Sequence, residues 1–566
     1  MKLLMTVLLF VIGLPQVSAT NYLITTGVDG VANDGNCTLR EALLAADTQS
    51  AVDECPAGTA DNTITLDNSV VVFFFIQGEM EITNPQNLTI NSLDISEDPP
   101  TINMLNANRF IAAELAGFNL TITGVNFFQG RDTSGEGGGV LWIDSGNEAS
   151  DLTVTNVQFL SSTAVAADGG AVLFSGSGYA FFRRVLFQNN TADAGSGMSL
   201  NIRESSAFNV INEIEFINND SKNGRGALNI SINGGFLLVT GVEVVDNLAS
   251  GGNDVAGIYI ETINDVFSNN INLFGLTIEE NEGAGIFVNN SKGNVVFDGA
   301  ILKNNFKVGG LGSNQINVNS STTTGQTLLS NILAYQSITQ QGVGMVIRVD
   351  DENSEVSVRH ATIVNHVAGI VGSGVPNPQS VDLRNSIVYD NVNNLFNFDF
   401  DNDSLIGVDP LFTDVANEDF TLTATSPAVD AVSLTSVIDR INFDINLNPR
   451  IYNDLPDMGA YELQGPINVN LTFLGTGAGA VAYNFDGVLI DTCASDCSFI
   501  MQSTESLSLR PTANSGSIFD AWGQDCQFQS LGRCFIFKSG TDINVSVQFI
   551  DESEIIFNNG FEELVP

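Results

Sequence analysis

The chain has 566 residues, 43% of them apolar and 15% charged, so it can bury a large core. Acidic residues number 65 and basic residues 20, which gives a formal net charge of −45 at pH 7. A field of that sign repels nucleic acid and anionic membrane surfaces, and this argues against both as partners. Beyond the N-terminus no apolar run reaches the roughly 18 residues of a transmembrane helix, so no membrane span is expected in the mature chain.

The N-terminus has the three parts of a secretory signal. Lys2 is basic, the stretch from Leu3 to Leu14 is a short apolar run, and Val17-Ser18-Ala19 is a small-residue cleavage site. We therefore expect residues 1–19 to form a signal peptide and the mature protein to be exported. It would be either secreted or held at the outer surface of the cell.

Six cysteines suit an oxidising compartment, and they fall into two local sets. One set is Cys37 with Cys55, and the other is Cys493, Cys497, Cys526 and Cys534. This arrangement predicts a Cys37–Cys55 disulfide and two bridges among the last four cysteines. The sequence does not distinguish the three pairings open to those four.

A short helix is expected inside residues 33–55, between the first two cysteines. Thr38 followed by Glu41 forms a capping box, and the apolar stripe after it is amphipathic (Leu39, Ala42, Leu43 and Ala46). An open end of a stacked-strand fold exposes backbone edges and core, so a helix placed there would protect the first coil. The Cys37–Cys55 bridge would hold this cap in place.

From residue 124 onward a three-part pattern returns every 24 to 34 residues. A turn-type residue is followed three positions later by an apolar residue, and six positions later by a small or polar one. The turn-type residues are Gly124, Asn156, Arg184, Glu213, Gly241, Gly275, Gly299, Asn331, His360 and Asn385. A period in this range is typical of a solenoid.

Each repeat carries short alternating runs rich in Val, Ile, Thr and Phe, such as residues 120–123 and 237–240, bounded by Gly, Asn and Asp. Such runs predict strands and turns, and no sustained helical stripe is present, which excludes a helical solenoid. Parallel crossovers are overwhelmingly right-handed. The sequence therefore predicts an all-β protein built on a right-handed parallel β-helix over residues 20–465, with an N-terminal capping helix and a small C-terminal β module.

The last position of the repeat predicts a structural ladder of stacked amides at one inward turn of each coil. The expected ladder residues are Asn190, Asn219, Asn247, Asn281, Asn305 and Asn391. Gly130, Ser162, Ser337 and His366 take the same position in other repeats. The amides would hydrogen-bond to one another and to the turn backbone.

Motifs at both ends of the solenoid resemble those of a known family. The sequence from Cys37 to Leu43, CTLREAL, resembles the CSLREAI motif that opens many exported bacterial β-helix proteins. Asp409-Pro-Leu-Phe412, Ser426-Pro-Ala-Val-Asp430 and Asp457-Met-Gly-Ala-Tyr-Glu462 resemble the closing motifs of bacterial choice-of-anchor Q proteins. The resemblance covers about residues 20–465 and implies a pectin-lyase-like β-helix on an exported or surface protein. It implies no catalytic site, because the family is not defined by one.

The composition changes after Gly465-Pro466, and residues 466–550 carry four of the six cysteines. This part resembles a divergent InlB B-type repeat, a small β module of bacterial surface proteins. We expect Trp522 to be a core residue of this module rather than a ligand platform. The C-terminal tail, residues 551–566, resembles a short "GFE" ending of exported proteobacterial proteins, and its role is left open.

The sequence offers little catalytic machinery. Residues from Leu141 to Asp144 resemble part of a pectate-lyase signature, but Ser145 replaces the expected histidine. Gly-His-Gly does not occur, and basic residues do not recur in register as a β-eliminating lyase would need. No catalytic or cofactor-binding residue is therefore predicted.

The two histidines and one acidic run are the remaining candidates. His360 falls on the turn position and His366 on the ladder position of one coil, so we expect both to be structural. Asp399, Asp401 and Asp403 begin a calcium-loop spacing, but Ser404 replaces its glycine and Pro410 its final glutamate. No metal site is predicted beyond these three as calcium candidates.

We therefore expect a non-enzymatic, exported β-helix protein with an adhesive or structural role, folded as a monomer. Its partner would be an extracellular carbohydrate or another surface protein. The alternative is a polysaccharide lyase or glycoside hydrolase, which requires acids or a base that converge in one groove. A third hypothesis is a passive spacer that carries the C-terminal module.

Overall fold

The computed structural model describes residues 19–94, 98–203, 208–251, 254–263, 269–307, 314–322, 324–337, 340–351, 353–374, 381–397, 403–432, 442–452, 455–523 and 526–553. The chain forms two compact units. The first consists of Met1–Asn272, Thr277–Val295 and Asn305–Thr324, and the second of Leu273–Leu276, Val296–Asn304 and Gly325–Pro566. Most of the expected signal peptide (1–18) and of the tail (554–566) lies outside the described residues.

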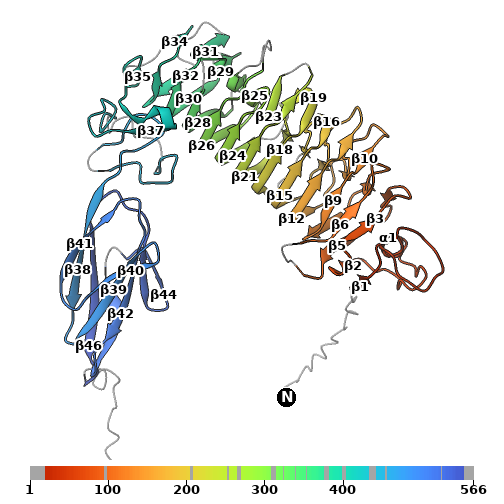
Figure 1. Ribbon diagram of the computed structural model, residues 1–566, viewed down its shortest axis with the longest axis horizontal. Coiled ribbons are helices and arrows are strands. Elements are labelled where there is room, and N and C mark those ends of the chain that lie inside the picture. Colours follow the sequence, from red (N-terminus) through yellow and green to blue (C-terminus); the bar gives the residue numbers. More distant parts are fainter. Residues whose placement is uncertain are drawn as a thin grey trace, which may run out of the picture. The chain divides into compact units, whose positions relative to one another are not determined.

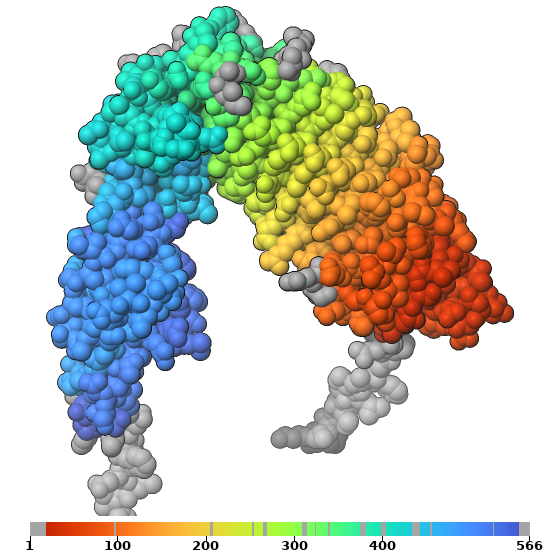
Figure 2. Space-filling view, in the orientation of Figure 1, coloured from red at the N-terminus to blue at the C-terminus, as the bar shows by residue number. Residues whose placement is uncertain are grey.

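The first unit is a stack of coils, and each coil contributes strands to two parallel sheets (Figure 1). In Figure 2 successive coils follow one another as adjoining bands from orange to yellow-green. The first sheet contains β1 (Thr20–Ile24), β2 (Asp61–Leu66), β3 (Val72–Phe74), β5 (Gln86–Ser92), β6 (Thr101–Asn103), β8 (Phe118–Thr123), β9 (Asn126–Phe128), β12 (Leu152–Leu160), β15 (Ala180–Gln188), β18 (Phe208–Ile217) and β21 (Gly235–Val245). β24 (Asn269–Glu279) and β26 (Asn294–Lys303) are divided between the two units.

The second sheet is built from shorter strands that follow each long strand in the coil. It contains β4 (Met80–Glu81), β7 (Ile111–Ala113), β10 (Arg131–Asp132), β11 (Leu141–Asp144), β13 (Thr163–Ala164), β14 (Val172–Gly176), β16 (Thr191–Ala194), β17 (Met198–Arg203), β19 (Asp220–Arg225), β20 (Leu228–Asn233), β22 (Leu248–Ala249), β23 (Val255–Thr262), β25 (Ala284–Asn290) and β27 (Asn314–Ser320). The predicted fold class, a right-handed parallel β-helix, is confirmed.

Equivalent residues of successive coils lie directly above one another. Val154 pairs with Phe182, Phe182 with Ile211, and Ile211 with Val239, and all four side chains are buried. A second column consists of phenylalanine rings that stack face to face, from Phe127 through Phe159 and Phe187 to Phe216, with centroids 5.3, 5.1 and 4.9 Å apart. Each coil thus buries its apolar face only against its neighbours, as expected for a solenoid.

The ten turn-type residues of the repeat all have positive φ, between 49° and 82°. Eight lie inside a long strand, and Gly124 and Asn385 each lie between two short ones. Asn156 interrupts β12, Arg184 β15 and Glu213 β18, while the flanking residues stay in register. Each is a one-residue corner at which the strand bends. Left-handed backbone at Arg184 and Glu213 carries a steric cost that the register of the neighbouring coils compensates.

The N-terminal end of the first unit is covered by α1 (Leu39–Thr48). Thr38 is its N-cap and forms the expected capping box with Glu41. The two carboxylate oxygens of Glu41 accept hydrogen bonds from the backbone N–H groups of Ala32 (2.8 Å) and Thr38 (2.9 Å). Arg40 donates to both oxygens of Asp29 and lies 3.9 Å from the centre of the Phe75 ring. The capping motif therefore ties the helix to the first coils through charge-assisted bonds.

The second unit begins with further coils of the same kind. Its strands are β28 (Gln326–Tyr335), β30 (Glu355–Val364), β32 (Val381–Arg384), β33 (Ile387–Tyr389) and β35 (Leu405–Ile406), and, in the second sheet, β29 (Val343–Val349), β31 (Ala368–Gly374) and β34 (Asn393–Phe396). A short antiparallel pair follows, β36 (Phe412–Asp414) and β37 (Asp419–Leu422), joined by the 3₁₀ turn Val415–Asn417. The pair precedes an irregular closing segment that contains residues 442–452 and 455–465.

The C-terminal module is a two-sheet β sandwich of nine strands. One sheet has the order β41 (Cys497–Gln502), β38 (Pro466–Leu474), β46 (Ile543–Asp551), β43 (Ser517–Trp522); the other has β40 (Val488–Cys493), β39 (Gly479–Phe485), β42 (Leu507–Ala513), β45 (Arg533–Ile536), β44 (Phe528–Ser530). Trp522 lies in the core between the sheets, 6% exposed, and its Nε1 donates to the Gly532 carbonyl. Among the described residues no helix has the length and apolar character needed to cross a membrane.

The structure joins the cysteines in three disulfides. Cys37 is bonded to Cys55, next to the capping helix. In the C-terminal module the pairs are Cys493–Cys497 and Cys526–Cys534, one of the three pairings that the sequence left open. Both bridges of the module are local, with separations of 4 and 8 residues.

Candidate functional site

The expected ladder residues of the first unit form one continuous column of buried amides. The Nδ2 group of each donates to the Oδ1 atom of the next, at 3.0 Å for Asn190–Asn219, 2.9 Å for Asn219–Asn247, 2.9 Å for Asn247–Asn281 and 2.7 Å for Asn281–Asn305. Gln315, which the repeat did not predict, continues the column by accepting from Asn305 at 2.6 Å. With side chains buried and paired, this column is a structural feature with no surface for a ligand.

The second unit contains a short equivalent of the column. The backbone N–H of His366 donates to Oδ1 of Asn391 at 2.8 Å, so the histidine stands in the position of an amide. Nδ2 of Asn391 donates to Oδ1 of Asn394 at 3.1 Å, which continues the short column. Ser337, at the same repeat position, is exposed and instead donates to Asn304. Burial lowers the pKa of His366 to about 4, so its ring is neutral at physiological pH.

His360 occupies a corner of its coil, where it is buried and has a φ of 49°. Its Nδ1 lies 3.2 Å from the Asp457 carbonyl, and its Nε2 lies 3.4 Å from the amide of Asn385. Burial holds the pKa of His360 well below its usual value. Without a solvent-facing nitrogen, this imidazole is not placed to exchange protons with a substrate.

The closing segment holds a group of buried titratable side chains around Arg450. This guanidinium is buried and donates to the carbonyls of Gly459 and Ala460, each at 3.0 Å. Asp457 accepts from the backbone of Asp430 and Leu463, and Glu462 accepts from Tyr452 and Asp457. Their carboxylates are thus engaged by the backbone of the segment itself, which makes the group a structural lock rather than an open site.

Burial is the main cause of the pKa shifts in this group. It raises the pKa of Asp457 to about 6, and together with the charge of Asp457 it raises the pKa of Glu462 to about 9. The acids and Arg450 are 1 to 4% exposed, so no substrate reaches them in this conformation.

The calcium candidates receive no support from geometry. Asp399 and Asp401 lie outside the described residues. Asp403 is described, and its backbone carbonyl accepts from the N–H of Asn385 at 2.7 Å. Across the described ranges no three His, Cys, Asp or Glu side chains are grouped so that they could hold a metal ion.

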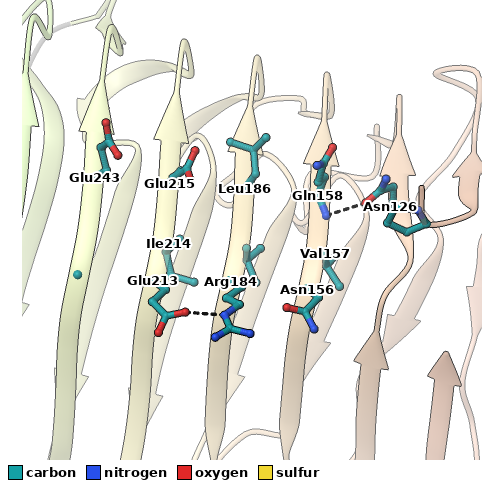
Figure 3. A pocket seen from close by; sticks show the side chains of 13 residues that line it. Asn126, Asn156, Val157, Gln158, Arg184, Leu186, Glu213, Ile214, Glu215 and Glu243 are labelled. Atoms are coloured by element: carbon teal, nitrogen blue, oxygen red, sulfur yellow. Dashed lines mark hydrogen bonds and ion pairs between the residues drawn. The ribbon is translucent and has the colours of Figure 1, made fainter. Parts of the chain in front are cut away.

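An open groove of about 580 Å³ lies on the outer face of the first sheet, in the first unit. Its main axis crosses β12, β15, β18 and β21, so successive coils contribute equivalent side chains (Figure 3). One row of side chains comes from the corner residues Asn156, Arg184 and Glu213, with Gly241 after them. The bend of each strand at these residues creates the concavity.

The second row of the groove is fixed by strand register. Gln158 pairs with Leu186, Leu186 with Glu215, and Glu215 with Glu243. Asn126 closes the row at its N-terminal end and accepts from the backbone N–H of Gln158 at 3.1 Å. The groove therefore presents amides at one end and carboxylates at the other, on a rigid support.

One ion pair crosses the first row. Arg184 Nε donates to Glu213 Oε2 at 2.7 Å (Figure 3). Arg183 lies 3.8 Å from the other oxygen of Glu213. The bond to Arg184 lowers the pKa of Glu213, so this carboxylate stays ionised. Glu215 and Glu243 have no basic partner within ion-pair distance among the described residues. The net charge of the lining is therefore negative.

The pectate-lyase-like segment lies elsewhere, on the second sheet. The guanidinium carbon of Arg109 lies over the ring of Trp142 in β11, 5.0 Å from the ring centre. A carboxylate oxygen of Asp144 lies 3.4 Å from a guanidinium nitrogen of Arg203. Arg109 is itself engaged by Glu79 and Glu136. This cluster shares no residue with the groove.

The fold and the groove define the class of the protein: a parallel β-helix with an open polar groove across its coils. No family model matches the sequence, and no curated protein matches it. Among solved structures, the chain is similar to pectate lyase Pel9A, with 14% identity, 79% of this chain and 97% of that chain covered, and a TM-score of 0.35. It is also similar to a double mutant of the periplasmic alginate epimerase AlgG, with 10% identity, coverage of 59% and 83%, and a TM-score of 0.23.

Proposed function

We propose that this is an exported, non-enzymatic β-helix protein that binds an extracellular polysaccharide in the groove across β12, β15, β18 and β21, in an adhesive or structural role at a bacterial surface. The groove itself is the observation that supports the proposal. It is open and polar, and equivalent side chains recur along it, which suits a polymer of repeated sugar units. The sequence motifs at both ends of the solenoid support a surface location.

The composition of the groove favours binding over catalysis. Its lining includes one basic side chain, Arg184, and Glu213 already holds that guanidinium. A lyase needs a base free to take a proton from the sugar. A glycosidase needs one carboxyl group kept protonated, usually by burial, and the glutamates of this groove are exposed.

A glycan array probed with the mature protein tests the proposal directly. Any hit is then assayed for new reducing ends and for unsaturated sugars, and we expect binding without either product. Gln158→Ala removes one exposed amide from the groove and should weaken binding about fivefold, the effect of roughly one hydrogen bond. Thr153→Ala, outside the groove on the same strand, is the matched control. Release of product would instead establish an enzyme.

Export is tested separately. β1 begins at Thr20, so cleavage after Ala19 would leave the whole described fold intact. We expect the secreted or surface-associated protein to begin at Thr20 when its N-terminus is sequenced. A mature chain that starts at Met1 would contradict export by this route.

A further inference from the structure

We infer that the ligand is a polysaccharide that carries amino groups, and that a strip of aromatic rings beside the groove is its second contact. This inference rests on the proposed function and names the chemical class of the sugar. Two independent features carry it: the groove carboxylates of Glu215 and Glu243, which have no basic partner among the described residues, and outward-facing aromatic rings on or next to β15, β18 and β21.

The aromatic strip consists of Tyr179, Phe181, Phe208 and Phe236. Their neighbours Ala180, Phe182 and Asn209 point inward and are buried, so alternation along the strands turns the rings outward. Phe208 is 48% exposed and stacks on Phe236, with centroids 4.4 Å apart; Tyr179 and Phe181 stack at 5.9 Å. The other three rings are half-buried, and an outward-facing aromatic surface of this kind commonly marks a binding surface.

The strip and the groove belong to one face. Phe208 and Glu213 lie on β18, five residues apart, which corresponds to roughly 16 Å of strand. Phe236 and Glu243 lie seven residues apart on β21, as Phe208 and Glu215 do on β18, which corresponds to roughly 23 Å of strand. Adjacent coils are about 4.8 Å apart, close to the length of one sugar unit in an extended chain. An extended chain of about five sugar units that runs along the strands therefore spans this distance, with ring faces on the aromatic strip at one end and amino groups over Glu215 and Glu243 at the other.

The charge of the groove selects among sugars. Glu215 and Glu243 are direct register partners on neighbouring strands, and like charges in that position repel each other. The fold thus maintains a repulsion at an exposed place, where a bound cation would relieve it. An ammonium group on the sugar supplies that cation, whereas the carboxylates of a polyuronate would add to the repulsion. The exposed amide of Gln158 and the half-buried amide of Asn156 are available for sugar hydroxyls.

The test compares three ligands by calorimetry at mildly acidic pH: a glucosamine oligomer, the N-acetylglucosamine oligomer of equal length, and oligogalacturonate. We expect the full-length mature protein to bind the glucosamine oligomer at least tenfold more tightly than the N-acetylated one, and not to bind oligogalacturonate. Glu215→Gln with Glu243→Gln should remove the tenfold preference. Glu54→Gln with Glu355→Gln, exposed positions outside the groove, changes the net charge equally and should leave the preference intact.

The rings are tested by Phe208→Ala, which should weaken both oligomers about tenfold, with Phe396→Ala on the other sheet as the control. Unchanged thermal unfolding shows that each variant is folded. Equal or tighter binding of a neutral or acidic oligomer overturns the inference but leaves the proposed function standing. Polylysine that binds with the same dependence on Phe208 also overturns it, because the site then recognises basic peptides. Failure to bind any glycan contradicts both.

Discussion

The side-chain amide of Asn190 donates a hydrogen bond to Oδ1 of Asn219 at 3.0 Å, and both side chains are fully buried. The same oxygen accepts from the backbone N–H of Asn190 at 3.0 Å. Asn219 in turn donates to the Phe187 carbonyl and to Asn247. One amide thus satisfies the backbone of two coils, so the column couples the stability of each coil to its neighbours.

Asn219→Ala should therefore destabilise the protein markedly. The change leaves the Phe187 carbonyl and the Asn190 donors without a buried partner, at a cost of about 2–4 kcal/mol in the free energy of unfolding. Chemical denaturation monitored by circular dichroism measures the loss. Asn147→Ala, at an exposed turn, is the control and should change stability by less than about 0.5 kcal/mol. Equal effects of the two changes would show that the column contributes no specific stability.

The repeat positions could be predicted because every coil needs the same two backbone features, a left-handed corner and an inward turn that a side-chain amide satisfies. Glycine and asparagine tolerate left-handed backbone, and they mark the corner at most of the ten positions. Arg184 and Glu213 do not favour that conformation, and only their register with Asn156 and Gly241 identifies them. Gln315 was missed because it lies 10 residues after Asn305, off the period of the repeat.

The groove could not be predicted in the same way. Its second row reads Gln158, Leu186, Glu215 and Glu243, four positions with no common residue type. Outward side chains are not constrained by packing, so they do not repeat even when their backbones do. These side chains can be recognised as neighbours only when residues nearly 30 positions apart are placed in register. The lock around Arg450 was hidden for a related reason, since its partners are carbonyls, which leave no pattern in a sequence.

The capping helix offers a second test. Arg40→Lys keeps the charge but loses the two-point contact with Asp29 and the stacking over Phe75. We expect a local loss of about 1–3 kcal/mol, since charge-assisted bonds of buried groups are strong. Hydrogen exchange of residues 39–48 should accelerate accordingly. Arg131→Lys, at an exposed position, should leave this exchange unchanged; acceleration in both would point to a general effect of lysine.

His366 should make the protein sensitive to acid. Its folded pKa, about 4, lies below the unfolded value of 6.5, so the neutral ring stabilises the fold above pH 6.5 and this contribution is lost as the pH falls towards 4. The shift corresponds to about 3 kcal/mol. His366→Asn restores an amide to the column and should flatten the dependence of stability on pH between 6.5 and 4. Denaturation curves across this range measure it, and an unchanged slope would exclude His366 as the cause.

Glu462 should act in the opposite direction. Its pKa is raised from 4.5 to about 9, so the neutral carboxyl is favoured in the folded state. The stability it contributes is complete below pH 4.5 and is lost as the pH rises through 9, because an anion must then be buried. Hydrogen exchange of residues 455–463, corrected for intrinsic rates, should accelerate more from pH 7 to 10 than that of the core strand β18. Glu462→Gln removes the titrating group, but it also removes one of the two oxygens that accept from the backbone. The variant should therefore be less stable than the natural protein at low pH, and its exchange rates should change little between pH 7 and 10. If hydrogen exchange in the variant accelerates at alkaline pH as much as in the natural protein, another group in the closing segment is responsible.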